Sequence, residues 1–168
     1  MCSEHWLNKD NYDLIQFTRF KCAAIFYRTI TTHGGVAIYL QCEVKYKVVN
    51  IDKFCIENNI EVVAVNLVDF NIILVSMYRS TSGDANMFLT KLDKLLTFLR
   101  VFNLQILICG DFNIDINDNS STSVEFLNVL RTFNCYCSNF EPTRGKSCLD
   151  NAVSNFPKSI ISTKVNQF

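Results

Sequence analysis

The sequence predicts a layered α/β domain, and two observations support this class. The first is the order of elements, because short apolar runs typical of strands alternate with longer runs whose apolar residues recur at helical spacing. The second is composition: 49% of the 168 residues are hydrophobic and 12% are aromatic, which is enough for one buried core. This composition excludes a disordered chain. We therefore expect a single domain over residues 1–168.

Three strands are predicted before the first helix, at residues 36–40, 62–67 and 72–78. The first follows the Gly34-Gly35 pair, and the third follows Asn71, which indicates a turn. A polar loop over residues 79–84 leads into an amphipathic helix, whose apolar residues recur at spacings of three and four. These apolar residues are Phe88, Leu92, Leu95, Leu96 and Leu99.

A strand buried on both faces is predicted at residues 104–109, because this run is continuously apolar and stops at Gly110. A second helix is expected to begin near Thr122, which has capping-box spacing to Glu125. Asn134 is the expected end of this helix. A polar turn at residues 141–145 precedes the last predicted strand, residues 147–153.

The charge balance excludes a simple nucleic-acid coating module, because 16 basic residues cancel 16 acidic residues. An enzyme that holds phosphate through a metal remains compatible with this balance. The eight cysteines are interpreted as free thiols, since no Cys-x-x-Cys pair exists to build a zinc site and the N-terminus lacks a signal peptide. We expect a reducing intracellular location. No apolar run is long enough to cross a bilayer.

The segment Gly110-Asp111-Phe112-Asn113 is the first candidate for chemistry, since it directly follows the predicted buried strand. In layered α/β domains, ligands bind beyond the carboxyl ends of strands. Asp111 and Asn113 occupy alternate positions, so we expect their side chains on one face, where a carboxylate and an amide can orient water and bind a phosphate oxygen. A plain turn after a strand favours the same residue types, so the segment alone leaves both interpretations open.

Six segments, taken in order, resemble the endonuclease/exonuclease/phosphatase superfamily, whose fold is that of DNase I. They are residues 4–7 (EHWL), 34–39 (GGVAIY), 75–79 (VSMYR), 110–115 (GDFNID), 141–144 (EPTR) and 148–151 (CLDN). More narrowly, they resemble the endonuclease domain of insect-type non-LTR retrotransposons. The resemblance extends from Glu4 to about Asn155. It implies a DNase I-like layered α/β sandwich, with two mixed sheets flanked by helices.

The resemblance also implies roles for five residues in metal-dependent phosphodiester hydrolysis. Glu4 matches the metal-binding glutamate, with Mg²⁺ or alternatively Mn²⁺ as the ion. Tyr78 matches a tyrosine near the scissile phosphate, and Asp111 matches the aspartate that positions or deprotonates the attacking water. Asn113 matches the amide that holds the phosphate, and Asp150 matches the carboxylate that orients a catalytic histidine. The implied substrate is duplex DNA in the nucleus, nicked to prime reverse transcription.

Two features of the family pattern are not found in this sequence. The family's first strand carries a metal-binding asparagine, whereas only three residues precede Glu4 in this sequence. The family's last strand carries a Ser-Asp-His motif, which is not found in this sequence up to Phe168. We therefore expect a sandwich that is incomplete at its N- and C-terminal strands, with weak or absent nuclease activity. His5 is expected to point away from Glu4 on extended backbone, and His33 to lie on a loop, so neither replaces the missing histidine.

Two other functions stay open at this point. One is a non-catalytic remnant or domesticated binding module that keeps the fold. The other is a phosphatase of the same superfamily. Nothing in the sequence implies a membrane partner or a stable protein partner.

Overall fold

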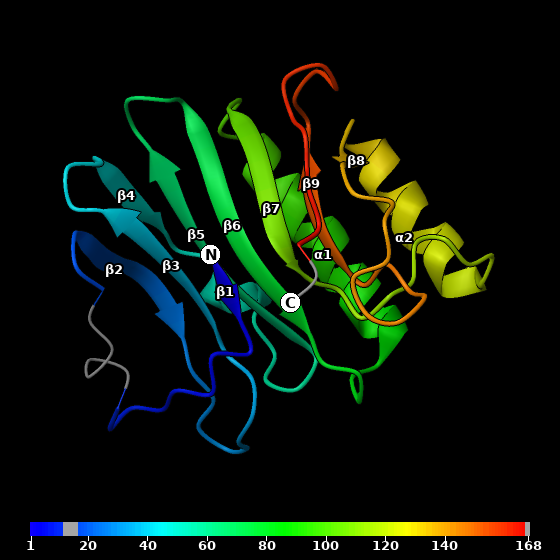
Figure 1. Ribbon diagram of the computed structural model, residues 1–168, viewed down its shortest axis with the longest axis horizontal. Helices are drawn as coiled ribbons and strands as arrows, with labels where there is room; N and C mark the ends of the chain where they lie inside the picture. The colour runs from blue at the N-terminus through cyan, green and yellow to red at the C-terminus, as the bar shows by residue number, and fades with distance from the viewer. Residues whose placement is uncertain (12–16, 167–168) are drawn as a thin grey trace.

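Two β-sheets pack face to face in the computed structural model, which describes residues 1–11 and 17–166 (Figure 1). The small sheet is antiparallel and has the order β1 (Cys2–Ser3), β3 (Val36–Gln41), β2 (Phe20–Phe26). The large sheet is mixed. It has the order β4 (Tyr46–Val49), β5 (Ile60–Leu67), β6 (Ile72–Arg79), β7 (Gln105–Asp111), β9 (Asp150–Ser154), β8 (Tyr136–Cys137).

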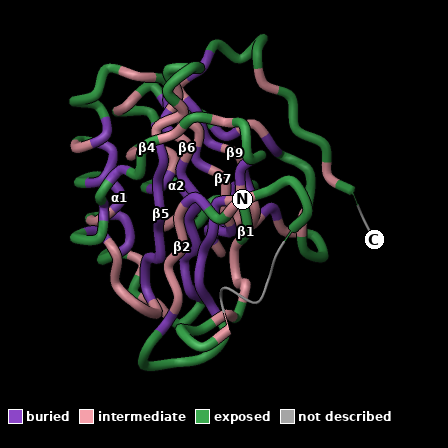
Figure 2. The backbone as a smooth tube through the Cα atoms, turned by 90° about the vertical axis from the view of Figure 1, so that its left-hand side faces the viewer, coloured by how far each residue is buried: buried purple, intermediate pink, exposed green. Residues whose placement is uncertain are grey.

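The two helices pack on the outer face of the large sheet, so the molecule has three layers. Helix α1 (Ala85–Arg100) connects β6 to β7, and these two strands run parallel, as a strand–helix–strand crossover requires. The Asp84 side chain caps α1 by accepting from the Met87 N–H. Helix α2 (Ser121–Thr132) follows β7. Figure 2 shows α1 on one side of β5 and β2 on the other.

Successive residues on each strand of the large sheet point to opposite faces, one toward the helices and the other toward the small sheet, because strand side chains alternate. Val62 and Ala64 of β5 belong to the core under the helices, together with the predicted leucine stripe of α1. Val63 and Val65 face the small sheet instead and pack with Val36, Ile38 and Leu40. The predicted α/β class and its helix-flanked sandwich of two sheets are therefore confirmed.

Several predicted boundaries need correction. The N-cap of α2 is Ser120, whose hydroxyl accepts from the Ser123 N–H, so the Thr122–Glu125 capping box is wrong. The last strand begins at Asp150 rather than at residue 147, because Ser147 closes a tight turn with Arg144. Strands β1, β2, β4 and β8 and a short 3₁₀ helix (Asp52–Phe54) were not predicted.

The prediction that residues 104–109 are buried on both faces is half right. Ile106 and Ile108 are buried against the helices, whereas Leu107 and Cys109 on the other face are only partly buried. The physical reason is the width of the small sheet: it has three strands against six, and it covers β5 and β6 more fully than β7 and β9. One face of β7 is therefore accessible near the end of the strand.

The eight cysteines are free thiols in the structure, as predicted. Burial raises the pKa of several of them, including Cys55 and Cys109, each to about 11. Cys55 and Cys109 are therefore protonated at neutral pH. Across the described part of the chain, neither helix combines the length and the apolar character that crossing a membrane requires.

Candidate active site

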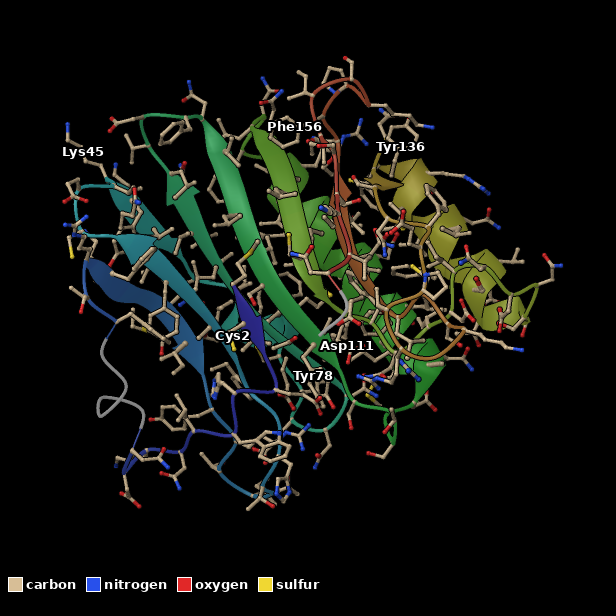
Figure 3. All side chains as sticks on the ribbon, in the orientation of Figure 1. Cys2, Lys45, Tyr78, Asp111, Tyr136 and Phe156 are labelled. Atoms are coloured by element: carbon tan, nitrogen blue, oxygen red, sulfur yellow. The ribbon has the colours of Figure 1, made fainter. Side chains whose placement is uncertain are left out.

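Three of the predicted site residues form a row across adjacent strands. Tyr78 on β6 lies directly beside Asp111 on β7, and Asp111 lies directly beside Asp150 on β9. Residues paired in this way point to the same face of a sheet, here the face toward the small sheet. Figure 3 shows Tyr78 and Asp111 together at one end of the large sheet, opposite the end where Lys45 and Phe156 lie.

Strand β1 brings Glu4 to this row. Cys2 and Ser3 pair with Ala37 and Val36 of β3, and the Ser76 hydroxyl donates to the Cys2 carbonyl at 3.2 Å. The chain then turns at Glu4, whose φ is 53°, so the expected extended backbone is wrong at this residue. This turn lets the Tyr78 hydroxyl donate to Glu4 Oε1 at 2.6 Å.

Glycine at position 110 permits the close approach of β7 to β6. A Cβ atom there would lie 1.8 Å from the Met77 carbonyl oxygen, so no side chain fits. The chain continues from Gly110 directly into Asp111, which is 2% exposed. The close strand contact thus fixes the position of the buried carboxylate relative to Tyr78.

Asp111 and Asn113 are joined by a hydrogen bond, because the Asn113 N–H donates to Asp111 Oδ1 at 3.0 Å. Asn113 has a φ of 46°, a left-handed conformation that asparagine tolerates. Its side-chain amide donates to the Arg79 carbonyl at 2.7 Å, and Arg79 Nη1 donates back to the Asn113 carbonyl at 3.2 Å. The carboxylate and the amide are therefore both held in defined orientations.

Arg144 completes the cluster, and the sequence did not single it out. Its Nη2 lies 3.0 Å from Asp111 Oδ2, and its Nη1 donates to Asn113 Oδ1 at 3.2 Å. The side chain of Arg144 is 55% exposed, whereas that of Asp111 is 3% exposed. The signal that could have found this arginine is its place in a polar turn just before the strand that carries Asp150.

Asp150 is positioned by the same turn. The Thr143 hydroxyl accepts from the N–H groups of Leu149 and Asp150, both at 3.1 Å, and so ties the turn to the start of β9. Asp150 lies close enough to Asp111 for its negative charge to raise the pKa of that carboxyl. The structure thus places two carboxylates side by side at the open face of the sheet.

Burial and charge change the acidity of two groups in the site. Burial is the main cause that raises the pKa of Asp111 above its ordinary value, and the negative charge of Asp150 adds to it; the Asn113 N–H and Arg144 partly oppose the increase. Burial, the hydrogen bond to Glu4 and the charges of Glu4 and Asp111 raise the pKa of Tyr78. Tyr78 is therefore a protonated hydrogen-bond donor at neutral pH.

A buried ion pair supports Tyr78 from behind. Glu61 of β5 lies directly beside Tyr78 in the sheet and pairs with Arg28, whose Nε is 2.5 Å from Glu61 Oε1. The Gly35 N–H donates to the other carboxylate oxygen of Glu61 at 2.6 Å. The Arg28 guanidinium lies 5.8 Å from the centre of the Tyr78 ring. The row of paired residues thus spans four strands, from Glu61 to Asp150.

A cavity of about 410 Å³ opens beside the row, on the inner face of β6, β7 and β9. It is lined by Asp150, by polar groups such as Ser76 and Asn139, and by residues 1–3 and 163–166. The Thr163 hydroxyl anchors the last of these segments by donating to the Ser138 carbonyl at 2.7 Å. The uncovered face of β7 and β9 therefore provides space for a ligand next to Asp150.

The histidines lie apart from the carboxylate row, in agreement with the sequence. His5 Nε2 is 3.0 Å from the Phe26 carbonyl oxygen, and burial lowers its pKa. His33 is on the loop between β2 and β3, where its ring is 4.6 Å from that of Trp6. Neither histidine contacts Asp111 or Asp150 in the hydrogen bonds of the described residues.

Glu4 is the candidate ligand for a divalent cation. Within residues 1–11 and 17–166, no group of three or more His, Cys, Asp or Glu side chains is arranged to hold a metal. Mg²⁺ does not need such a group, because it is commonly bound by one or two carboxylates together with water and substrate phosphate. The donor set therefore fits Mg²⁺ shared with a phosphate, and it does not fit a protein-only zinc cage.

The sequence matches no protein-family model, and no curated protein matches it by sequence. Solved structures do resemble it. The endonuclease domain of TRAS1, a telomere-specific non-LTR retrotransposon, has a TM-score of 0.57 at 17% identity, over 82% of this chain and 67% of that chain. The 3′ phosphatase NExo from Neisseria, bound to a product DNA hairpin, has a TM-score of 0.60 at 16% identity, over 90% and 74%.

A third similar structure is an endonuclease/exonuclease/phosphatase family protein from Bacteroides thetaiotaomicron. Its TM-score is 0.51 at 10% identity, over 73% of this chain and 54% of that chain. At these identities the similarity identifies the fold. The chain has the fold of the endonuclease/exonuclease/phosphatase structures, and the predicted DNase I-like architecture is confirmed.

Proposed function

From this fold and the geometry of its site, we propose that the protein is a Mg²⁺-dependent phosphodiester hydrolase that nicks DNA, with Mn²⁺ as an alternative ion. One observation carries the proposal. Asp111 is a buried, oriented carboxylate that lies directly beside Tyr78, and Tyr78 in turn holds Glu4. A base and a metal ligand on the same sheet face are the two parts that hydrolysis by water needs.

Asp111 is the proposed base for the attacking water. Its pKa is raised by burial, which makes the carboxylate a better proton acceptor than an exposed aspartate. The Asn113 N–H holds Oδ1, so the orientation of the carboxylate is fixed before substrate arrives. Arg144 on Oδ2 has to move aside, or bind the phosphate itself, before water can approach that oxygen.

Glu4 is the proposed metal ligand, and Tyr78 orients it. The Tyr78 hydroxyl donates to Oε1, which leaves the carboxylate free to use its other oxygen. When bound there, Mg²⁺ supplies positive charge that stabilises the phosphate oxygens as the bond breaks. Tyr78 also lies directly beside Asp111, which suits its proposed place near the scissile phosphate.

Asn113 and Asp150 have proposed supporting roles. The Asn113 amide already bonds to Arg79 and Arg144, so it is held rigidly enough to position a phosphate oxygen. Asp150 faces the cavity beside Asp111 and is the proposed orienting carboxylate. DNA as substrate is supported by the printed descriptions of the TRAS1 domain and of NExo, of which the latter is bound to a DNA hairpin. A nuclear location and a role beside a reverse transcriptase belong to the same proposal, and the similarity to the retrotransposon endonuclease domain supports them.

A non-catalytic DNA-binding module is the second candidate, and Arg144 favours it. In the structure its guanidinium bonds to both Asp111 and Asn113, the groups that water and phosphate would otherwise contact. If this contact persists with DNA bound, the protein binds without hydrolysis. A phosphatase is the third candidate, favoured by the similarity to the 3′ phosphatase NExo. The reaction products distinguish the binding module and the phosphatase from the DNA-nicking hydrolase.

The test is nicking of supercoiled plasmid in Mg²⁺, in Mn²⁺ and in EDTA. We expect slow formation of open-circular product with either ion, in keeping with the weak activity expected from the sequence, none in EDTA, and a loss of at least about 100-fold in Asp111→Asn. Asp93→Asn is the matched control, because it makes the same change on the exposed face of α1. Release of phosphate from a 3′-phosphorylated oligonucleotide without nicking would instead identify a phosphatase. Binding of the DNA with neither product formed would identify a binding module.

A further inference from the structure

An exposed tryptophan stands two residues after the proposed metal ligand. Trp6 is the sole tryptophan of the sequence, and its side chain is 60% exposed. Tryptophan carries a large apolar ring that proteins bury in preference to most side chains. The arrangement around Trp6 instead keeps its ring in solvent at the edge of the site.

The backbone at Trp6 is held rigidly. Its φ is 58°, a left-handed conformation that bulky residues rarely adopt. The Trp6 N–H donates to the Gly34 carbonyl at 2.9 Å, and the Leu7 N–H donates to His5 Nδ1 at 2.9 Å. His5 is itself tied to the Phe26 carbonyl of β2. The segment that presents Trp6 is therefore fixed to the small sheet on both sides of the ring.

A second rigid loop lies against the ring. His33 packs on Trp6 with the ring planes at 82° and the centroids 4.6 Å apart. Glu57 fixes this loop, because its carboxylate accepts from three successive backbone N–H groups, those of Thr29, Ile30 and Thr31. Ile30 on the same loop is 85% exposed. Trp6 and His33 thus form a preorganised aromatic edge.

This edge lies within reach of a nucleic acid bound at Glu4. Two residues of chain span at most about 7 Å, which corresponds to about two base steps at the 3.4 Å rise of one DNA strand. The chain carries 16 basic and 16 acidic residues, so phosphate attraction alone provides little affinity. Stacking of a base that has left the duplex stack on an aromatic ring supplies affinity that does not depend on net charge or on sequence.

We propose that Trp6, buttressed by His33, is a base-stacking contact for the DNA strand beside the scissile phosphate. This inference rests on the proposed function and names the way in which the same site holds its substrate. The ring binds a base one or two steps from the phosphate at Glu4. The contact positions DNA and takes no part in the chemical step.

Because Trp6 is the sole tryptophan, its fluorescence reports on this contact alone. The first measurement is emission of the intact chain titrated with an unlabelled phosphorothioate duplex in Mg²⁺, so that the ion at Glu4 is kept while hydrolysis is slowed. Anisotropy of the same duplex, labelled with fluorescein, measures binding independently. We expect emission to be quenched along the same saturation curve as the anisotropy change.

The second measurement compares variants by anisotropy and by nicking kinetics. Trp6→Ala is expected to weaken DNA binding by about tenfold or more, and to raise KM with kcat unchanged. Trp6→Phe keeps an aromatic face and is expected to stay close to wild type. Phe70→Ala is the matched control, because Phe70 is equally exposed at 60% but lies in the β5–β6 turn, at the other end of these strands from Tyr78.

The outcomes separate this inference from the proposed function. Binding by anisotropy with unchanged Trp6 emission, and a Trp6→Ala affinity equal to that of Phe70→Ala, overturns the stacking contact while hydrolysis stands. Binding with quenched emission but no nicking supports the contact and overturns hydrolysis. No binding and no nicking overturns both. If Trp6→Ala melts early by circular dichroism, the wild-type emission and Trp6→Phe decide the question.

Discussion

The exposed guanidinium of Arg144 lies 3.0 Å from the nearly buried carboxylate of Asp111. A surface side chain thus reaches inward and places its positive charge beside a carboxylate that the fold withdraws from solvent. The pKa of Asp111 is nevertheless raised, because burial and the negative charge of Asp150 outweigh the cation. Arg144 therefore moderates the basicity of Asp111 rather than setting it.

Replacing Arg144 by glutamine is expected to move the acid limb of the pH–rate profile to higher pH. Loss of the cation removes an interaction that lowers the pKa of Asp111, so the carboxylate ionises later as pH rises. The measurement is kcat/KM for plasmid nicking between about pH 4 and about pH 8, a range that begins near the ordinary pKa of an aspartate and extends well above it. Arg131→Gln, an equal charge change on α2, should leave the limb in place. An unshifted limb in Arg144→Gln would show that Asp111 is not the titrating base.

Replacing Asp111 by asparagine is expected to stabilise the fold at neutral pH. A carboxyl whose folded pKa lies above its ordinary value of 3.8 loses stability as pH rises from that value through the raised pKa, because the unfolded state ionises more readily. The amide has no such cost. Thermal unfolding should give a higher Tm for Asp111→Asn at pH 7, with the difference shrinking toward pH 3. A difference that is constant with pH would contradict the sign of the shift.

Tyr78→Phe is expected to weaken the binding of Mg²⁺ at the site. The substitution removes the 2.6 Å hydrogen bond to Glu4 and keeps the ring that packs against the small sheet. The Mg²⁺ concentration for half-maximal nicking should rise by about tenfold, the scale on which residues that orient metal ligands act. Tyr39→Phe, on β3, is the aromatic control. Equal Mg²⁺ curves for the two variants would remove Glu4 from the metal site.

Gly110→Ala is expected to disrupt the contact between β6 and β7. Its Cβ atom would meet the Met77 carbonyl oxygen at 1.8 Å, and backbone cannot move aside as a flexible side chain can. We expect a loss of about 3 kcal/mol or more in the free energy of unfolding. Gly145→Ala has open space around the new methyl group and only the cost of a φ of 63°, about 1 kcal/mol. Urea denaturation of the two variants gives the comparison.

Helices and central strands could be predicted because their patterns are local. The stripe of α1 appears in the sequence as leucines at helical spacing, and the structure buries every one of the predicted residues. Short edge strands such as β1 and β8, each of two residues, carry no periodicity and exist only through their pairing. The predicted position of the second helix start was close, but the capping hydroxyl came from Ser120 among several neighbouring candidates.

The site could be predicted in part for the same reason. Asp111 and Asn113 follow a recognisable strand, and the structure brings them into a hydrogen bond. The contact between Glu4 and Tyr78 joins residues 74 positions apart, so it depended on the resemblance rather than on any local signal. Arg144 lies in a turn whose residues equally suit a plain loop. Only the structure shows that its side chain points toward Asp111. The roles of these residues in hydrolysis remain predictions.

The row from Glu61 through Tyr78 and Asp111 to Asp150 makes the site depend on the register of four strands. If β7 slipped by one residue, Gly110 or Phe112 would take the place of Asp111, and the carboxylate would turn toward the helices. The same slip would turn Ile106 and Ile108 away from the core under the helices. Core packing would therefore be lost together with the arrangement of the site. The active constellation therefore requires the native pairing of β7 with β6 and β9, and any misaligned intermediate lacks it.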